Sequence, residues 1–273
     1  MPKLLIPIVT CLLFVCCKNE TASLDPIPEH EDHTIQSIVL KEDRVINVWL
    51  PPSYSESVSS FPVLYMPDGG VKEDFPHIAN TLNQLIEDER IPPIILVGIE
   101  NTERGRDLTG ASVVADDEQY CPLSDGAKDF RKFISEELFQ FIDSNYRTNE
   151  TRGIVGESLA GLFVMETFLM STSTFDFYIA MDPSLWWNDH YLVQHADSLL
   201  NQMPDDDVVL WFAGSDAQDI SEYTQSLNTI LKRSAPDVLQ WTYADYPNEH
   251  HHTIFRASKE AAFIWTLTRV AER

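Results

Sequence analysis

The stretch GIVGESLAGLF, residues 153–163, decides the fold because it sets Ser158 between a short apolar run and a long one. The apolar run before Ser158 predicts a strand, and the longer run after it predicts a helix. A side chain at the tip of so tight a turn needs a strained backbone, and the small residues Gly156 and Ala160 reduce the crowding there. The sequence therefore predicts a strand, a sharp turn and a helix that expose the hydroxyl of Ser158 at the edge of a sheet.

The backbone around this serine predicts a site for an oxyanion. The N–H of Leu159 and the N-terminus of the helix would both point at negative charge formed beside Ser158. A second backbone donor is expected in the loop after the apolar run 62–66, where Gly69 and Gly70 let the main chain approach a ligand closely. The alternatives are a serine that only caps a helix and an ordinary glycine turn.

A serine hydroxyl needs a histidine to take its proton, and YPNEHHHTIF, residues 246–255, supplies the candidates. This segment lies between the last expected strand and the last expected helix. The residues alone leave the base open among His250, His251 and His252. Metal binding is the competing interpretation, although contiguous histidines point in divergent directions and no further ligand cluster accompanies them. We expect no metal and no organic cofactor.

The acid that orients the histidine is expected after the strand before last. The segment AGSDAQD follows the apolar run 208–212. Asp216 is the first candidate and Asp219 the second. Either aspartate could instead cap the helix that starts near Ile220.

Length and charge narrow the classes of protein that this chain can be. Its 273 residues, 44% of them hydrophobic, suffice for one large core, and no linker rich in Gly, Ser or Pro divides them. There are 43 acidic residues against 19 basic ones, a formal net charge of −24. Such a charge repels nucleic acid and anionic membrane surfaces. We therefore expect one domain over residues 34–273 and no nucleic-acid partner.

The first residues resemble a bacterial lipoprotein signal. Lys3 is followed by an apolar run over residues 4–15 and then by Cys16 and Cys17. The run is too short to span a bilayer, which takes about 20 residues, but it suits an export signal. The resemblance implies a signal over residues 1–17, lipidation of Cys17, a polar tether over residues 18–33 and a place in the bacterial cell envelope. Cleavage before Cys16, an ordinary cleaved signal and an uncleaved anchor are the alternatives.

The order of apolar runs predicts the architecture. The runs 35–40 and 44–50, separated by a short turn, predict an antiparallel start. Strand and helix patterns then alternate, which favours parallel strands with right-handed crossovers. The further strand runs are 62–66, 94–99, 152–155, 177–181, 208–212 and 239–244, and the helical patterns fall in 78–86, 130–142, 223–231 and 261–270. We predict a doubly wound, mostly parallel α/β sheet with antiparallel N-terminal strands.

Six blocks in this order resemble the putative esterase family of the α/β-hydrolases, which includes siderophore trilactone esterases and S-formylglutathione hydrolases. They are PVLYMPDGG, IPPIILVGIENTERGRDLTG, GAKDFRKFISEELFQFIDSNYRT, GIVGESLAGLF, FYIAMDPSLWW and the histidine loop. The resemblance covers most of the chain beyond Val63, and it implies the α/β-hydrolase fold and hydrolysis of an ester.

The resemblance also implies roles for single residues. Ser158 matches the nucleophile, and the N–H groups of Leu159 and Gly70 match the oxyanion donors. His251 matches the base, because the family's histidine follows an acidic residue and one spacer, here Glu249 and a second histidine.

Three residues depart from the family's pattern. Glu157 replaces a frequent histidine before the nucleophile, Ala160 replaces a glycine, and Asp182 stands where serine is common before PSLWW. None of these changes removes a reacting group, so they bear on the substrate and the rate more than on the class of reaction.

Three side chains are expected to bind substrate. Trp186 and Trp187 follow a strand end, where they could wall an acyl or aryl pocket or pack in the core. Arg106 could meet an anionic group of the substrate, and the alternative is a structural ion pair with Asp107.

The expected function is that of an exported serine carboxylic-ester hydrolase with an acyl-enzyme intermediate, acting on a small-molecule, siderophore or carbohydrate ester. An acyltransferase uses the same residues, and a catalytically silent protein that binds a glycan or a siderophore would keep the fold without the reaction.

Overall fold

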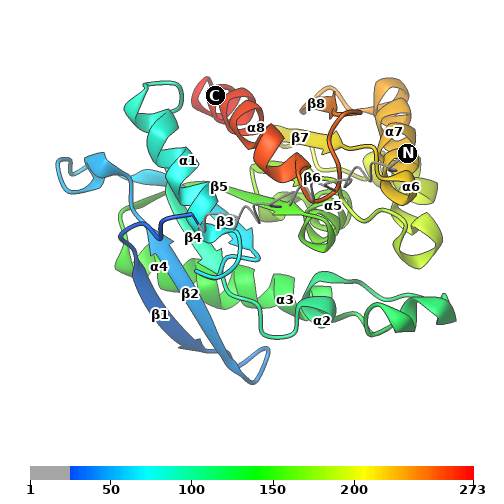
Figure 1. The fold of residues 1–273 in the computed structure, drawn as a ribbon, viewed down its shortest axis with the longest axis horizontal. Coiled ribbons are helices and arrows are strands. Elements are labelled where there is room, and N and C mark those ends of the chain that lie inside the picture. Colours follow the sequence, from blue (N-terminus) through cyan, green and yellow to red (C-terminus); the bar gives the residue numbers. More distant parts are fainter. Residues whose placement is uncertain (1–24) are drawn as a thin grey trace, which may run out of the picture.

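The sheet follows the predicted architecture. The structure, a computed structural model, describes residues 25–273, and in that part of the chain eight strands form one sheet in the order β1-β2-β4-β3-β5-β6-β7-β8 (Figure 1). The strands are β1 (Glu31–Gln36), β2 (Asp43–Trp49), β3 (Phe61–Pro67), β4 (Ile95–Ile99), β5 (Thr148–Glu157), β6 (Phe177–Met181), β7 (Val208–Gly214) and β8 (Leu239–Asp245). β2 is antiparallel to both β1 and β4, and all other neighbours are parallel. The predicted doubly wound sheet with antiparallel N-terminal strands is confirmed.

Helices cover both faces of this sheet (Figure 1). α1 (Phe75–Glu87) and α8 (Ile254–Ala271) pack on one face. The other face carries α3 (Gly126–Phe133), α4 (Phe139–Asn145), α5 (Leu159–Met170), α6 (Trp187–Leu200) and α7 (Gln218–Ser234). A π-helical turn, Ile134–Leu138, joins α3 to α4, and the shorter helices are α2 (Arg104–Leu108) and the 3-10 turns Pro52–Tyr54, Ala115–Gln119 and Thr172–Thr174.

The central strands are apolar along their length because both of their faces are buried. Successive side chains of a strand point to opposite faces. Ile154 of β5 packs in the core cluster on the α5 side, and its neighbour Val155 packs in the cluster under α1 and α8. Both side chains are fully buried. This two-sided burial explains why near-continuous apolar runs could be assigned as strands.

The folded part begins earlier than the expected boundary at residue 34. β1 starts at Glu31, and the last four residues of the expected strand 35–40 form a turn in which Ser37 Oγ accepts the N–H of Leu40. Asp25 forms an ion pair with Arg256 of α8. The segment before β1 therefore lies against the sheet's helical cover from residue 25 onward.

The predicted signal and the lipidation of Cys17 lie outside the described residues. Over residues 25–273, no helix is both long enough and apolar enough to cross a bilayer.

The strand order reverses beside β3, near the carboxyl edge that carries Ser158. From β3 the chain moves to β4 on one side and later to β5 on the other, and ligands of open α/β sheets bind where the order reverses in this way. Three residues just beyond neighbouring strand ends have left-handed backbones: Asp68 after β3 (φ 56°), Ser158 after β5 (φ 60°) and Asp182 after β6 (φ 42°). Non-glycine residues adopt this conformation rarely, and it clusters at functional sites.

Candidate active site

Ser158 occupies the predicted sharp turn. Its backbone angles are φ 60° and ψ −120°, and its N–H donates to the carbonyl oxygen of Met181 at the end of β6, N···O 3.0 Å. A Cβ at Gly156 would lie 2.5 Å from the carbonyl carbon of Ala160, and one at Gly161 would lie 3.0 Å from the oxygen of Met181. Gly156 therefore needs to be glycine for the turn to be this tight, and a side chain at Gly161 would push α5 slightly away from β6.

The structure brings His251 to this serine. The distance from His251 Nε2 to Ser158 Oγ is 2.9 Å, across 93 residues of sequence. The histidine loop is fixed by backbone hydrogen bonds, since Tyr246 N–H donates to Gly214 O and Asp216 N–H donates to Glu249 O. The imidazole is thus held where it can accept the proton of the hydroxyl.

A buried carboxylate orients the other side of the imidazole. Asp182 Oδ2 lies 2.9 Å from His251 Nδ1, and its side chain is fully buried. The same carboxylate accepts the N–H of Ser215 at 2.6 Å and its hydroxyl at 2.5 Å. Because Asp182 can only accept, Nδ1 must carry the proton, which leaves the lone pair of Nε2 toward Ser158. The hydrogen bond that His251 donates to Asp182 raises the pKa of His251, although burial opposes it.

The predicted acid, Asp216, does not reach His251, and this expectation is corrected. Its carboxylate lies 2.8 Å from Nδ1 of His250, in a largely exposed pair. Asp219, the second candidate, lies in the first turn of α7 and acts on His251 through its charge, which raises the pKa of the imidazole. The acid of this site follows β6 instead of β7.

The other two histidines of the loop face solvent. His250 and His252 are exposed, and their rings stack with centroids 5.7 Å apart. Within residues 25–273 no group of three or more His, Cys, Asp or Glu side chains has the arrangement of a metal site.

Glu157 is a further member of the site that sequence reasoning did not assign. Its Oε1 lies 3.5 Å from His251 Nε2, the nitrogen that faces the serine. Burial raises the pKa of Glu157 to about 7, and the positive charges of His251 and Arg104 oppose the rise. The only signal in the sequence was its position directly before the nucleophile, where the family often has histidine.

The two predicted oxyanion donors differ in the structure. Leu159 is the first residue of α5, so its N–H has no acceptor within the helix. The N–H of Gly70, by contrast, donates to Oε2 of Glu73, N···O 2.7 Å. Gly70 can therefore serve an oxyanion only when the Glu73 carboxylate moves away.

Of the predicted substrate-binding tryptophans, Trp187 is buried within the core, whereas Trp186 packs against the core with part of its ring exposed. Trp187 is 4% exposed, and its Nε1–H donates to the carbonyl oxygen of Gly110 at 3.0 Å. Trp186 is half-buried, with its ring edge-to-face against exposed Tyr120 at a centroid distance of 5.2 Å. Trp186 and Tyr120 are thus the aromatic surfaces that a ligand could reach.

Arg106 forms a structural ion pair, which corrects its expected role in substrate binding. Its Nη2 lies 2.6 Å from Glu42 Oε1, and its Nε donates to Asp107 Oδ1 at 2.7 Å. Arg104 lies nearer to the site, and both of its contacts to Asp68, at 2.7 and 2.8 Å, use the planar fork of the guanidinium. Neither arginine offers an unpaired positive charge to a substrate.

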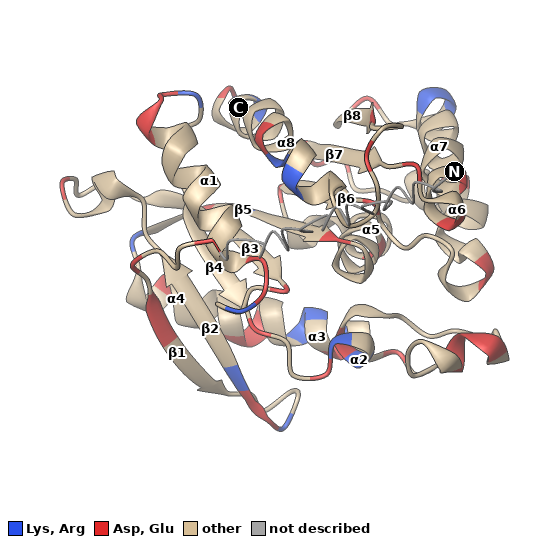
Figure 2. Cartoon of the chain, in the orientation of Figure 1, with Lys and Arg blue, Asp and Glu red and all other residues tan. Residues whose placement is uncertain are grey.

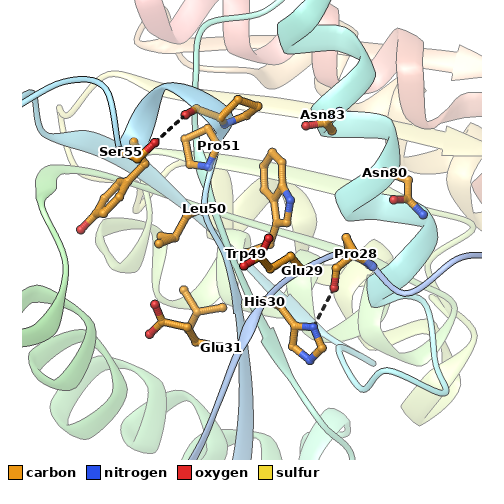
Figure 3. A pocket seen from close by; sticks show the side chains of 13 residues that line it. Pro28, Glu29, His30, Glu31, Trp49, Leu50, Pro51, Ser55, Asn80 and Asn83 are labelled. Atoms are coloured by element: carbon orange, nitrogen blue, oxygen red, sulfur yellow. Dashed lines mark hydrogen bonds between the residues drawn. The ribbon is translucent and has the colours of Figure 1, made fainter.

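A large surface pocket lies away from these residues. Figure 3 shows it between the start of β1, the end of β2 and α1, lined by Trp49, His30 and Asn80 among others, with a volume of about 530 Å³. None of its lining residues belongs to the cluster around Ser158.

Comparison with known proteins agrees with the fold and the motifs. The model of the family described as "Putative esterase" matches residues 37–269. The chain belongs to this esterase family. Among solved structures, an IroE-like serine hydrolase from Shewanella oneidensis superposes on this esterase-family chain with a TM-score of 0.78 at 30% identity, covering 88% of this chain and 80% of the other.

Curated relatives of this esterase-family chain include two siderophore esterases. The ferri-bacillibactin esterase BesA of Bacillus subtilis is 29% identical over 181 residues, which are 59% of this chain and 61% of BesA. The apo-salmochelin esterase of Escherichia coli O6:H1 is 24% identical over 242 residues, which are 81% of this chain and 74% of the relative. The chain spans less than two thirds of BesA and of the uncharacterized Bacillus subtilis protein YbbA, of which it covers 63%.

Proposed function

We propose that this chain is a serine carboxylic-ester hydrolase that works through an acyl-enzyme. The observation that carries the proposal is the continuous chain of short contacts from Ser158 through His251 to the buried Asp182, with distances of 2.9 Å on both sides of the imidazole. A hydroxyl, a base and an orienting acid in this geometry form the arrangement that activates serine on several unrelated folds. Membership in the esterase family supports the same reaction class.

In the first half of the reaction, Ser158 Oγ attacks the ester carbonyl while its proton passes to His251 Nε2. Asp182 stabilises the imidazolium through Nδ1–H, and the N–H of Leu159 stabilises the oxyanion. The bond from the acyl carbon to the alcohol oxygen then breaks, and His251 gives its proton to the departing alkoxide. The products of this half are the free alcohol and an ester of Ser158.

In the second half, water replaces the alcohol. His251 Nε2 takes a proton from the water as the water oxygen attacks the acyl carbon, and the bond to Ser158 Oγ breaks. His251 returns the proton to Oγ, and the carboxylic acid leaves. An alcohol in place of water would make the same machinery an acyltransferase.

For the substrate we propose a siderophore ester. The relatives named as ferri-bacillibactin esterase and apo-salmochelin esterase support this choice. The reachable ring of Trp186, with Tyr120 against it, lies in the segment that follows Asp182 and offers an aromatic surface for an aryl or acyl group.

The test is turnover by the wild type and by Ser158→Ala on trilactone siderophores, acetylated or feruloylated sugars and 4-nitrophenyl esters. Loss of Oγ should lower kcat by about 10⁶-fold. Ser173→Ala, at an exposed position after α5, is the matched control and should keep full activity. Equal turnover by the wild type and Ser158→Ala would refute the proposal, and a siderophore ester left intact beside rapidly cleaved sugar esters would refute the substrate.

A further inference from the structure

Glu157 gives His251 a second carboxylate neighbour. Asp182 contacts Nδ1, and Glu157 Oε1 lies 3.5 Å from Nε2, the nitrogen that exchanges a proton with Ser158. At this distance the carboxylate acts as a charge beside Nε2 and not as a close hydrogen-bond acceptor, so Ser158 Oγ, at 2.9 Å, keeps the better contact.

The side chain of Glu157 lies beside the reacting atoms. It is the last residue of β5, directly before the nucleophile, and only 17% of it is exposed. Its carboxylate lies close to any acyl group bonded to Ser158, because Glu157 Oε1 and Ser158 Oγ both lie within 3.5 Å of the same nitrogen, His251 Nε2.

We propose that Glu157 sets the charge selectivity of the site, so that its carboxylate favours neutral esters and disfavours esters that carry an anion near the scissile carbonyl. The inference rests on the proposed esterase function and adds to it the class of acceptable acyl group. Like charges in a partly buried site repel strongly because little water screens them.

The surrounding charges do not cancel this effect. The groups that act on Glu157 are His251 from the histidine loop, Asp74 before α1, Arg104 of α2 and Asp182 after β6. Arg104 is already engaged by both oxygens of Asp68. Two of the four groups are carboxylates, and Figure 2 shows acidic residues along most of the chain. An anionic acyl group would therefore find no free cation in this set once His251 has given up its proton.

The selectivity should depend on pH. Burial raises the pKa of Glu157 to about 7, so the side chain changes from mostly neutral to mostly charged between pH 6 and pH 8.5. The charge also favours the imidazolium form and raises the pKa of His251. Removing it should move the acidic limb of the kcat/KM profile, which reports deprotonation of His251, to lower pH.

The experiment compares 4-nitrophenyl butyrate with mono-4-nitrophenyl succinate, whose acyl groups differ by a terminal carboxylate that is ionised throughout this pH range. The ratio of kcat/KM for butyrate over succinate is measured at pH 6 and pH 8.5. In the wild type the ratio should rise with pH. Glu157→Gln keeps the shape of the side chain and removes its charge, so in this variant the ratio should be nearly constant with pH. At pH 8.5 the ratio should be about tenfold lower than in the wild type, which corresponds to about 1.4 kcal/mol.

Two further variants make the result decisive. Glu157→Asp keeps the charge and should keep a ratio that rises with pH, and Glu222→Gln, at an exposed position of α7, should match the wild type. Ratios that are equal in the wild type and Glu157→Gln at both pH values would overturn the inference. Failure of the wild type to cleave either ester faster than Ser158→Ala would instead overturn the proposed function.

Discussion

Two neighbouring histidines of one loop each pair with an aspartate, yet the structure gives them different surroundings. His250 lies 2.8 Å from Asp216, and His251 lies 2.9 Å from Asp182. The first pair is 61% and 42% exposed, whereas Asp182 is fully buried and His251 also contacts Ser158. A short distance to a histidine therefore does not by itself identify the orienting acid. The burial of Asp182, together with the contact between His251 and Ser158, identifies it.

The difference follows from what holds each carboxylate. Asp216 lies in an exposed loop, where water competes for its oxygens and surface ion pairs contribute little. Asp182 is excluded from water and accepts two hydrogen bonds from Ser215. Its oxygens cannot turn away from Nδ1 without losing these partners, so its geometry is preorganised for an imidazolium that forms during the reaction.

The largest expected contrast is between the two aspartates. Asp182→Asn should lower kcat by about 10⁴-fold, because an amide nitrogen facing Nδ1 favours the tautomer with its proton on Nε2. Asp216→Asn should change kcat by less than about twofold, since only an exposed pair is lost. Initial rates on 4-nitrophenyl butyrate, with thermal unfolding of each variant as a check on folding, measure both. A large loss in Asp216→Asn with full activity in Asp182→Asn would reverse the assignment.

A smaller effect is expected from Glu157, the second carboxylate beside His251. Among the described residues, His250 pairs with Asp216 and with no second carboxylate. The folded-state pKa of Glu157, about 7, is raised above the ordinary value of 4.5, so its contribution to stability is fully present below pH 4.5 and is lost as the pH rises through 7. Glu157→Gln removes this loss. Its free energy of unfolding relative to wild type should therefore increase by about 2–3 kcal/mol between pH 4.5 and pH 8.5.

Urea unfolding of the wild type, Glu157→Gln and the exposed control Glu222→Gln at both pH values measures this difference. A gap between wild type and Glu157→Gln that stays constant with pH would show that the carboxylate is not buried as the structure has it.

Local sequence patterns were sufficient for most of the strands and for the serine turn, whereas the choice of His251 among three histidines came from the resemblance to the esterase family. Five apolar runs coincide with the buried strands β3 to β7, because burial on both faces leaves a continuous pattern that needs no knowledge of the partners. The sixth run coincides with the edge strand β8, which is mostly half-buried. Gly156 precedes Ser158 for a reason that acts within a few residues, since a side chain there would meet the backbone of Ala160. The segment 37–40 was misassigned because its apolar side chains, including Ile38 at 84% exposure, lie in a turn that Ser37 closes.

The acid could not be found in this way, because its partner is set by the order of strands in space. Asp182 directly follows β6, the neighbour of β5, so the sheet places it beside Ser158. In the sequence, Asp182 stands where the family commonly has serine. Asp216 lies in the loop after the strand before last, where the acid is expected. The engagement of Arg106 by Glu42 and of Gly70 by Glu73 likewise depends on side-chain contacts that no motif records.

The central claim is that His251, and not its neighbour, activates Ser158. The most direct test is the rate at which a fluorophosphonate modifies Ser158 in the wild type, His250→Ala and His251→Ala, followed by intact mass and by mapping of the labelled peptide. We predict rapid labelling at Ser158 in the wild type and in His250→Ala, and a rate at least about 10³-fold lower in His251→Ala. Equal labelling of the two alanine variants, or modification at another serine, would contradict the account.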